Sequence, residues 1–122
     1  MTWHFSSKSK ANLATCAEPL QLLFNEIIKR VDCTVVCGHR AEEAQEEAFR
    51  TGHSKARWGE SRHNTMPSRA VDVVPYPIDW QDLARFQHFA GFVLGTASQM
   101  KIDIEWGGHW RFVDMPHYQI RT

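Results

Sequence analysis

The sequence predicts one α+β domain, in which a small antiparallel sheet carries helices packed on one side. The expected elements follow the order helix, helix, strand, helix, long loop, strand, helix, strand, strand. The last strands lie close together along the chain, which favours antiparallel pairing. No repeat, low-complexity tract or linker divides the 122 residues, and that length suits a single domain with a real core.

The N-terminal part is expected to form two helices. Residues 9–17 predict a short helix around Leu13. Pro19 suits the first turn of a second helix, because its missing N–H is not needed there, and this helix should end near Arg30. The apolar face of the second helix comprises Leu20, Leu23, Phe24, Ile27 and Ile28. This spacing indicates a helix that packs one side against a core.

A strand and a third helix follow. Residues 34–37 are apolar and rich in β-branched side chains, so they predict a strand, which Gly38 ends. Residues 41–50 consist largely of alanine, glutamate and glutamine, which favour a helix. Gly52 is the expected C-cap of that helix.

Residues 51–67 show no hydrophobic period and predict a long loop. Loops of that length inside compact domains are usually functional or disordered, and the presence of His63 favours a functional one. Residues 70–75 predict a strand. Asp79 is expected to cap a long helix that starts at Trp80 and runs to about residue 100. Its expected buried face comprises Leu83, Phe86, Phe89 or Ala90, Val93 and Leu94.

The C-terminal part predicts further strands. Residues 102–106 form the first, and the glycines at 107–108 turn the chain. Residues 110–113 and 118–120 predict two short strands on either side of a bend at residues 115–116.

The composition excludes several classes of partner. Lys and Arg number 14 and Asp and Glu number 14, so no net charge favours a nucleic acid or an anionic membrane. Residues 1–10 have no apolar segment of the kind found in signal peptides, and the chain has no long apolar run. We therefore expect synthesis in the cytoplasm without a signal peptide, and no membrane insertion. The five Trp residues are either core or, since Trp is common in ligand grooves, part of a binding cleft.

Three cysteines, an odd number, argue against a disulfide framework. Cys33 and Cys37 lie on the first expected strand, and four residues of strand separate them by roughly 13 Å, which is too far for a disulfide or a shared metal. We expect all three cysteines to be buried, structural free thiols.

His63 and Asp72 bracket the entry into the second expected strand. A lone histidine in a polar loop is usually solvated. Asp72, however, interrupts the otherwise apolar residues 70–74, and a buried carboxylate is costly unless it is paired or bound to a metal. Alternation along the strand also allows Asp72 to face solvent, opposite Val71 and Val73. Periodicity alone leaves both possibilities open.

Asp114 and His117 form a second polar pair. Pro116 excludes a regular helix across them, so this is not a helical zinc motif. Residues three apart on a straight strand face opposite sides, so a bend at residues 115–116 is needed to direct both side chains at one metal. The alternative is a turn with a solvated Asp and a surface His. Two imidazoles and one carboxylate suit a zinc ion with one open position, and a second carboxylate nearby suits a general base.

Several segments together resemble the LAS-type zinc peptidases, which include the D-Ala-D-Ala metallopeptidases and the phage L-alanyl-D-glutamate endopeptidases. The resemblance covers about residues 13–120, and the last two segments are most similar to the phage endolysin branch. The matching segments are Gly38-His39-Arg40 with Gln45, Ser61-Arg62-His63, Ala70-Val71-Asp72-Val73-Val74-Pro75-Tyr76, Trp106-Gly107-Gly108-His109-Trp110 and Phe112-Val113-Asp114-Met115-Pro116-His117. The resemblance implies a hedgehog/DD-peptidase-like fold and a single zinc peptidase domain over residues 1–122.

The resemblance also implies roles for individual residues. One zinc ion per chain would be held by His63, Asp72 and His117. Asp114 would be the general base. Arg40 would hold the substrate carbonyl or the developing oxyanion, and Ser61 would contact substrate.

The chain departs from the family pattern in one place. The family usually has Gly three residues after the first His and Asp seven after it, whereas here Met66 stands at the first position and Asp72 is the ninth residue after His63. The extra residues lie within 64–68, where Pro67 stiffens the backbone. Loops absorb insertions at low cost, so both ligands are retained in the prediction.

The predicted function is that of a phage endolysin. The expected reaction is hydrolysis of an amide bond in the peptide stem of bacterial peptidoglycan, with L-Ala-D-Glu as the favoured bond. We expect a bacteriolytic enzyme that acts as a monomer on the cell wall after its release from the host cytoplasm. Two alternatives are a D-Ala-D-Ala carboxypeptidase and a non-catalytic zinc-binding module on the same fold. A carboxypeptidase needs a cation for the terminal carboxylate, which Arg57, Arg62 or Arg69 could supply, whereas a binding module would need neither Asp114 nor Arg40.

Overall fold

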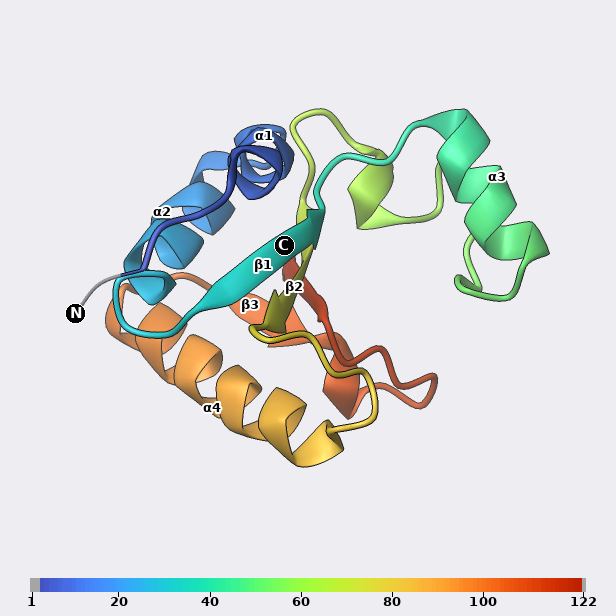
Figure 1. The fold of residues 1–122 in the computed structure, drawn as a ribbon. Coiled ribbons are helices and arrows are strands. Elements are labelled where there is room, and N and C mark those ends of the chain that lie inside the picture. Colours follow the sequence, from blue (N-terminus) through green and yellow to red (C-terminus); the bar gives the residue numbers. More distant parts are fainter. Residues whose placement is uncertain (1–2, 122) are drawn as a thin grey trace.

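In the computed structural model, which describes residues 3–121, a layer of helices covers one face of a four-stranded antiparallel sheet (Figure 1). The other face borders a cleft. The elements in chain order are α1 (Ser7–Ala14), α2 (Glu18–Ile27), β1 (Cys33–Cys37), α3 (Glu42–Arg50), η1 (Arg62–Asn64), β2 (Ala70–Pro75), α4 (Leu83–Gln99), β3 (Ile104–Trp106), η2 (Gly107–His109) and β4 (His117–Ile120), where η denotes a 3₁₀ helix. The α+β prediction is confirmed. Among the described residues no helix is both long and apolar enough to cross a membrane.

The sheet has the strand order β1-β2-β4-β3, and every neighbouring pair is antiparallel. β4, although it is the last strand in the chain, therefore lies inside the sheet between β2 and β3. The register of β2 and β4 places Asp72 directly opposite His117. Two of the predicted polar residues thus become cross-strand neighbours.

The core lies between the sheet and three of the helices. Val71 and Val73 of β2 and Tyr118 of β4 are fully buried there, and the rings of Phe24 and Phe89 pack edge-on against the Tyr118 ring. α1, α2 and α4 supply the helical side of this core. The buried face predicted for α4 is wrong at Leu83, which is exposed because it lies at the first residue of the helix, beside the cleft. α3 stands apart from the sheet, at the upper right of Figure 1. Gln45 is its one buried residue.

The predicted end of α3 is confirmed, whereas the predicted start of α4 is wrong. α3 ends at Arg50, and Gly52 follows with φ +83°, a conformation that glycine adopts at low cost. α4, in contrast, begins at Leu83 and not at Trp80, and its N-cap is Asp82. The predicted cap, Asp79, instead accepts a hydrogen bond from the backbone N–H of Gln81 at 3.0 Å and so forms a turn before the helix.

The strand predicted for residues 110–113 is wrong. These residues form a loop after η2, and Phe112 and Val113 in it are exposed. Their apolar character matched a strand pattern, but none of the strands in the described residues pairs with them. Its side chains instead form one wall of the cleft. The strands at 70–75 and near 118–120 are confirmed as β2 and β4.

Candidate metal centre and active-site cleft

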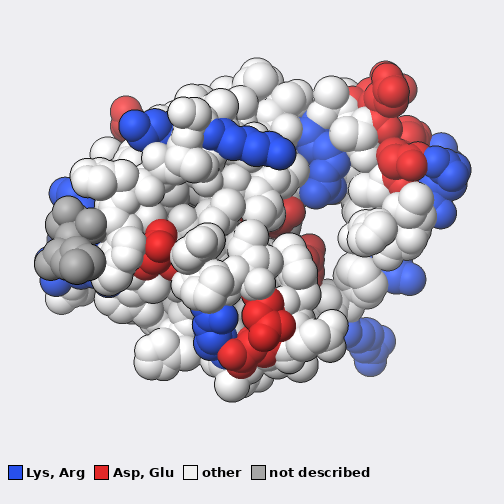
Figure 2. Space-filling view, in the orientation of Figure 1, with Lys and Arg blue, Asp and Glu red and all other residues white. Residues whose placement is uncertain are grey.

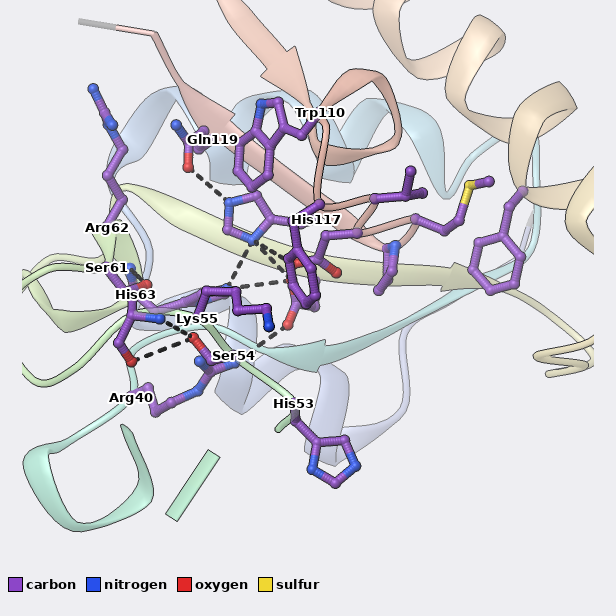
Figure 3. Close-up of a pocket in the computed structure, with 18 of the residues that line it drawn as sticks. Arg40, His53, Ser54, Lys55, Ser61, Arg62, His63, Trp110, His117 and Gln119 are labelled. Atoms are coloured by element: carbon purple, nitrogen blue, oxygen red, sulfur yellow. Dashed lines mark hydrogen bonds and ion pairs between the residues drawn. The ribbon is translucent and has the colours of Figure 1, made fainter. Parts of the chain in front are cut away.

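Three side chains from separate segments meet at the open face of the sheet (Figure 3). His63 comes from η1, Asp72 from β2 and His117 from β4. His63 Nε2 lies 3.2 Å from Asp72 Oδ1 and 3.2 Å from His117 Nδ1. His117 Nδ1 lies 3.3 Å from the same Asp72 oxygen. The three atoms form a nearly equilateral triangle.

This triangle has the dimensions of a metal site. Ligand atoms bound to zinc at about 2.0–2.1 Å lie about 3.3–3.4 Å from one another when the coordination is tetrahedral. The measured separations of 3.2–3.3 Å agree with that value. Two imidazole nitrogens and a carboxylate oxygen are also a donor set that zinc commonly takes. The residues therefore fit a zinc ion with a fourth position open toward the cleft.

The hydrogen bond at the far side of His63 directs its Nε2 lone pair into the triangle. His63 Nδ1 lies 2.7 Å from the backbone oxygen of Gly38, which can only accept, so Nδ1 carries the proton. The backbone of His63 is held in turn by Ser61, whose hydroxyl accepts from the His63 N–H at 3.1 Å. Ser61 thus caps η1 and also lines the cleft.

A chain of hydrogen bonds sets the opposite tautomer at His117. Glu105 Oε1 accepts from Gln119 Nε2 at 2.6 Å, so the amide of Gln119 presents its oxygen to His117. His117 Nε2, 2.8 Å from that oxygen, must donate, which leaves the Nδ1 lone pair free to face the triangle. Such outer partners fix the orientation and basicity of metal-binding histidines. Sequence reasoning missed Gln119, although its position two residues after His117 on a strand places both side chains on one face.

Arg40 borders the cluster from the end of β1. Its Nη2 lies 3.5 Å from Asp72 Oδ2, the carboxylate oxygen that does not face the histidines. Its Nη1 donates to Gln45 Oε1 at 3.0 Å. Gln45 is fully buried and makes three further hydrogen bonds, to the Asn64 amide, the Ser54 hydroxyl and the Ala56 carbonyl. This one side chain therefore connects α3, η1 and the loop that follows α3 to Arg40.

Asp114 reaches the cluster through a turn. The backbone N–H of His117 donates to the Asp114 carbonyl at 3.2 Å, which closes the predicted bend. Asp114 Oδ2 then lies 3.8 Å from His117 Nδ1. Gly107 permits this arrangement, because a Cβ there would lie 2.5 Å from the Asp114 carbonyl oxygen. The side chain of Trp106 also holds the turn, donating from Nε1 to the Met115 carbonyl at 2.7 Å.

The electrostatics of the cluster favour a cation between the ligand atoms. Burial alone would raise the pKa of Asp72, but the adjacent His63 and His117 hold it well below its usual range. Burial alone would lower the pKa of His63, but the Asp72 carboxylate outweighs it and raises that pKa to about 10. For Asp114, burial and then the Asp72 charge raise the pKa. Asp72 thus stays ionised, whereas Asp114 is the better proton acceptor of the two carboxylates.

Cys37 corrects the expectation that all three cysteines are buried structural thiols. Cys16 and Cys33 are buried, but Cys37 is only half-buried, because a bulge between Val35 and Cys37 shifts the register of β1. The bulge pairs Cys37 with Asp72 and redirects its side chain toward the cluster.

Cys37, His63 and Asp72 also form a group close enough to bind a metal, with one ligand atom of each within 4.8 Å of the others. The sequence prediction separated the cysteines from any metal. The Cys37 Sγ lies 3.8 Å from His63 Nδ1, the nitrogen that already donates to Gly38. We favour the triangle with His117, because both of its imidazoles direct free lone pairs inward.

The residues inserted between His63 and Asp72 do not separate the two side chains. Thr65 closes the loop on itself, since its hydroxyl donates to the Pro67 carbonyl and accepts from the Arg69 N–H. Ser68, fully buried, fixes the end of the loop through a 2.6 Å hydrogen bond from its hydroxyl to the Ala70 carbonyl. The exposed Met66 lies in the outward part of the loop.

The cluster lies at the base of a cleft of about 700 Å³. One wall is the loop after α3, with His53, Ser54 and Lys55, and the other is the loop after η2, with Trp110 and Phe112. The Trp110 ring packs against the His117 ring with 4.8 Å between centroids. Figure 2 shows the hollow between the α3 region and the rest of the molecule, with acidic and basic side chains at its edges. Such a cleft can accept an extended peptide across the ligand triangle.

Comparisons with known proteins report similarity in sequence and in overall fold. The family described as phage L-alanyl-D-glutamate peptidase matches residues 1–121. Among solved structures, the chain is similar to the crystal structure of the Serratia marcescens L-Ala D-Glu endopeptidase ChiX, with a TM-score of 0.80 and 29% sequence identity. That similarity covers 96% of this chain and 90% of the other. No curated protein matches the sequence.

Proposed function

The chain belongs to the phage L-alanyl-D-glutamate peptidase family, and on that premise we propose that it is a zinc-dependent endopeptidase of bacterial peptidoglycan. The proposed reaction is hydrolysis of the amide bond between L-alanine and D-glutamate in the peptide stem. The observation that carries the proposal is the triangle of His63 Nε2, Asp72 Oδ1 and His117 Nδ1 beside the carboxylate of Asp114. The proposed enzyme is one domain that acts as a monomer, as a phage endolysin.

We assign the metal to His63, Asp72 and His117. Zinc bound there supplies Lewis acidity, which polarises a carbonyl and makes water nucleophilic near neutral pH. The hydrogen bonds from His63 to Gly38 and from His117 to Gln119 support the assignment, because in the neutral ring that a metal ligand requires they place the proton on the nitrogen that faces away from the triangle.

Asp114 is the proposed general base. Its carboxylate borders the ligand triangle and is one-third exposed, so it can reach a water in the cleft. Asp114 takes the proton of the attacking water and delivers it to the nitrogen of the leaving D-glutamate. The pKa of this carboxylate, raised by burial and by Asp72, makes it a better proton acceptor than an ordinary surface aspartate.

Arg40 is the proposed electrostatic partner of the substrate carbonyl. Gln45 and Asp72 hold two of its guanidinium nitrogens and fix its orientation before substrate binds. Its remaining N–H groups can donate to the carbonyl oxygen as negative charge develops there. Ser61 is the proposed substrate contact at the same end of the cleft, since it lines the cleft beside His63.

The decisive experiment combines muropeptide mass spectrometry with three proteins: wild type, Asp114→Asn and a His63→Ala, His117→Ala double variant. Wild type should carry about one zinc per chain and release fragments cut between L-alanine and D-glutamate. Asp114→Asn should keep its zinc and fold but lose about 100- to 10,000-fold in turnover, the range for a lost general base. The double variant should lose its zinc.

Other outcomes would each reject a specific part of the proposal. Fragments cut at D-alanine would favour a carboxypeptidase. Zinc that stays stoichiometric in the double variant would reject the ligand set. Near-normal hydrolysis by zinc-loaded Asp114→Asn would reject the general-base role.

A further inference from the structure

The substrate carries a charge that the catalytic residues do not bind. A glutamate within a peptide uses only one of its two carboxyl groups to continue the chain, and the other remains a free anion beside the scissile amide. The cleft already contains the carboxylates of Asp72, Asp114 and Glu60, which repel such an anion. A cationic side chain that is free to pair with this carboxylate would offset that repulsion.

Most of the cationic side chains that line the cleft are already engaged. Arg40 is held by Gln45 at 3.0 Å and by Asp72 at 3.5 Å. Arg62 donates to the backbone oxygen of Arg121 at 3.2 Å, and Figure 3 shows it directed away from His63. These contacts leave Lys55 as the candidate.

Lys55 lies in the cleft without a carboxylate neighbour. Among the described residues no Asp or Glu oxygen lies within ion-pair distance of its ammonium. The ammonium instead lies over the ring of Phe112, 5.2 Å from the centroid, on the opposite wall. Contacts of this kind contribute only about 0.5–1 kcal/mol at exposed sites, so they can hold the ammonium over the cleft without competing strongly with an anion.

Both neighbours of Lys55 in the chain are hydrogen-bonded to Gln45. Gln45 Nε2 donates to the Ser54 hydroxyl at 3.1 Å and to the Ala56 carbonyl at 2.7 Å. The side-chain amide of Gln45 also accepts a hydrogen bond from Arg40, so Gln45 links the position of Lys55 to the part of the cleft that contains Arg40. A long side chain anchored in this way has less freedom to lose when it binds a ligand.

We propose that Lys55 is the specificity-determining cation of the cleft and binds the free carboxylate of the D-glutamate residue. This inference rests on the proposed function, because it names the group of that substrate which Lys55 recognises. Phe112 keeps the ammonium above the cleft until substrate arrives.

The test compares two peptides and five proteins. One peptide contains L-alanyl-D-glutamate with its free carboxylate, and the other carries a neutral carboxamide at that position. The proteins are wild type, Lys55→Met, Arg62→Met and the control Lys10→Met, which removes an exposed lysine of α1. Zinc content and melting temperature of each protein are measured first, and Lys55→Arg is added because it restores the charge.

Lys55→Met should lower kcat/KM for the carboxylate peptide by about 10- to 100-fold, as expected when a charged hydrogen bond is lost, mainly through KM. Its kcat/KM for the carboxamide peptide should change by less than about twofold, and Lys55→Arg should recover part of the loss. Lys10→Met should match wild type on both peptides.

Equal losses on both peptides, or no loss on either, would overturn the assignment of Lys55. A selective loss in Arg62→Met alone would also overturn it and move the carboxylate site to Arg62. Failure of the proposed function itself would be distinguishable, because wild type would then leave the L-alanine to D-glutamate bond intact in both peptides.

Discussion

Replacing Gln45 with leucine tests how the cleft is held together. Gln45 is fully buried, and its amide makes four hydrogen bonds, with Arg40, Asn64, Ser54 and Ala56. Leucine has a similar size but can make none of them. At about 0.5–1.5 kcal/mol for each hydrogen bond, the substitution should destabilise these contacts by about 2–6 kcal/mol in total.

The matched control is Gln21→Leu in α2, which removes a single 2.8 Å hydrogen bond to the Cys16 carbonyl. That control should lose only about 0.5–1.5 kcal/mol and keep full activity. Gln45→Leu should show faster amide exchange across residues 41–64 and a lower kcat/KM, because Arg40 and the Lys55 loop lose a common anchor. Urea unfolding, hydrogen-exchange mass spectrometry and peptide hydrolysis measure these effects. If Gln45→Leu loses no more stability than Gln21→Leu and exchange in residues 41–64 is unchanged, the anchoring role of Gln45 is refuted.

Three further predictions concern the metal centre. After zinc is removed with a chelator, the melting temperature should fall as pH rises from about 6.5 toward 10. The reason is that the pKa of His63 is about 10 in the folded protein, so its ion pair with Asp72 stabilises the fold fully only below the unfolded-state pKa of about 6.5. A melting temperature that calorimetry shows to be independent of pH over this range would contradict the prediction. Gln119→Leu should weaken zinc binding about 10- to 100-fold in a chelator competition, because His117 loses the acceptor that fixes its tautomer; unchanged affinity would exclude that role. A Cys33→Val, Cys37→Val double variant should keep its zinc in elemental analysis at some cost in stability, and loss of zinc would place the Cys37 thiol among the ligands.

Much of the fold could be predicted because its signals are local. The apolar spacing of α2 and the β-branched run of β2 each report what one segment does by itself. The start of α4 could not be predicted, because Asp79 and Asp82 are both chemically able to cap and only the backbone geometry selects between them. The strand predicted for residues 110–113 was wrong for a different reason, because the wall of a cleft and a strand can have the same apolar composition.

The sequence allowed the residues of the candidate site to be proposed, but it did not allow their geometry to be predicted. The placement of Asp72 opposite His117 follows from strand register, which the sequence does not encode locally. The bulge that turns Cys37 toward His63 adds one residue to β1 without a glycine or proline to mark it. The role proposed for Lys55 carried no local signal, because it depends on Phe112 on the opposite wall of the cleft.

The strand order β1-β2-β4-β3 also determines which strand pairs can form before the whole chain has been synthesised. Among the described residues β3 pairs with β4 alone, so it has no strand partner until the residues of β4 have been synthesised. The same four residues bring the fully buried Tyr118 into the core and His117 to the candidate metal centre. An incomplete chain on the ribosome therefore lacks both a finished core and a finished ligand triangle. Completion of the core and assembly of the proposed ligand triangle therefore depend on the same strand, β4.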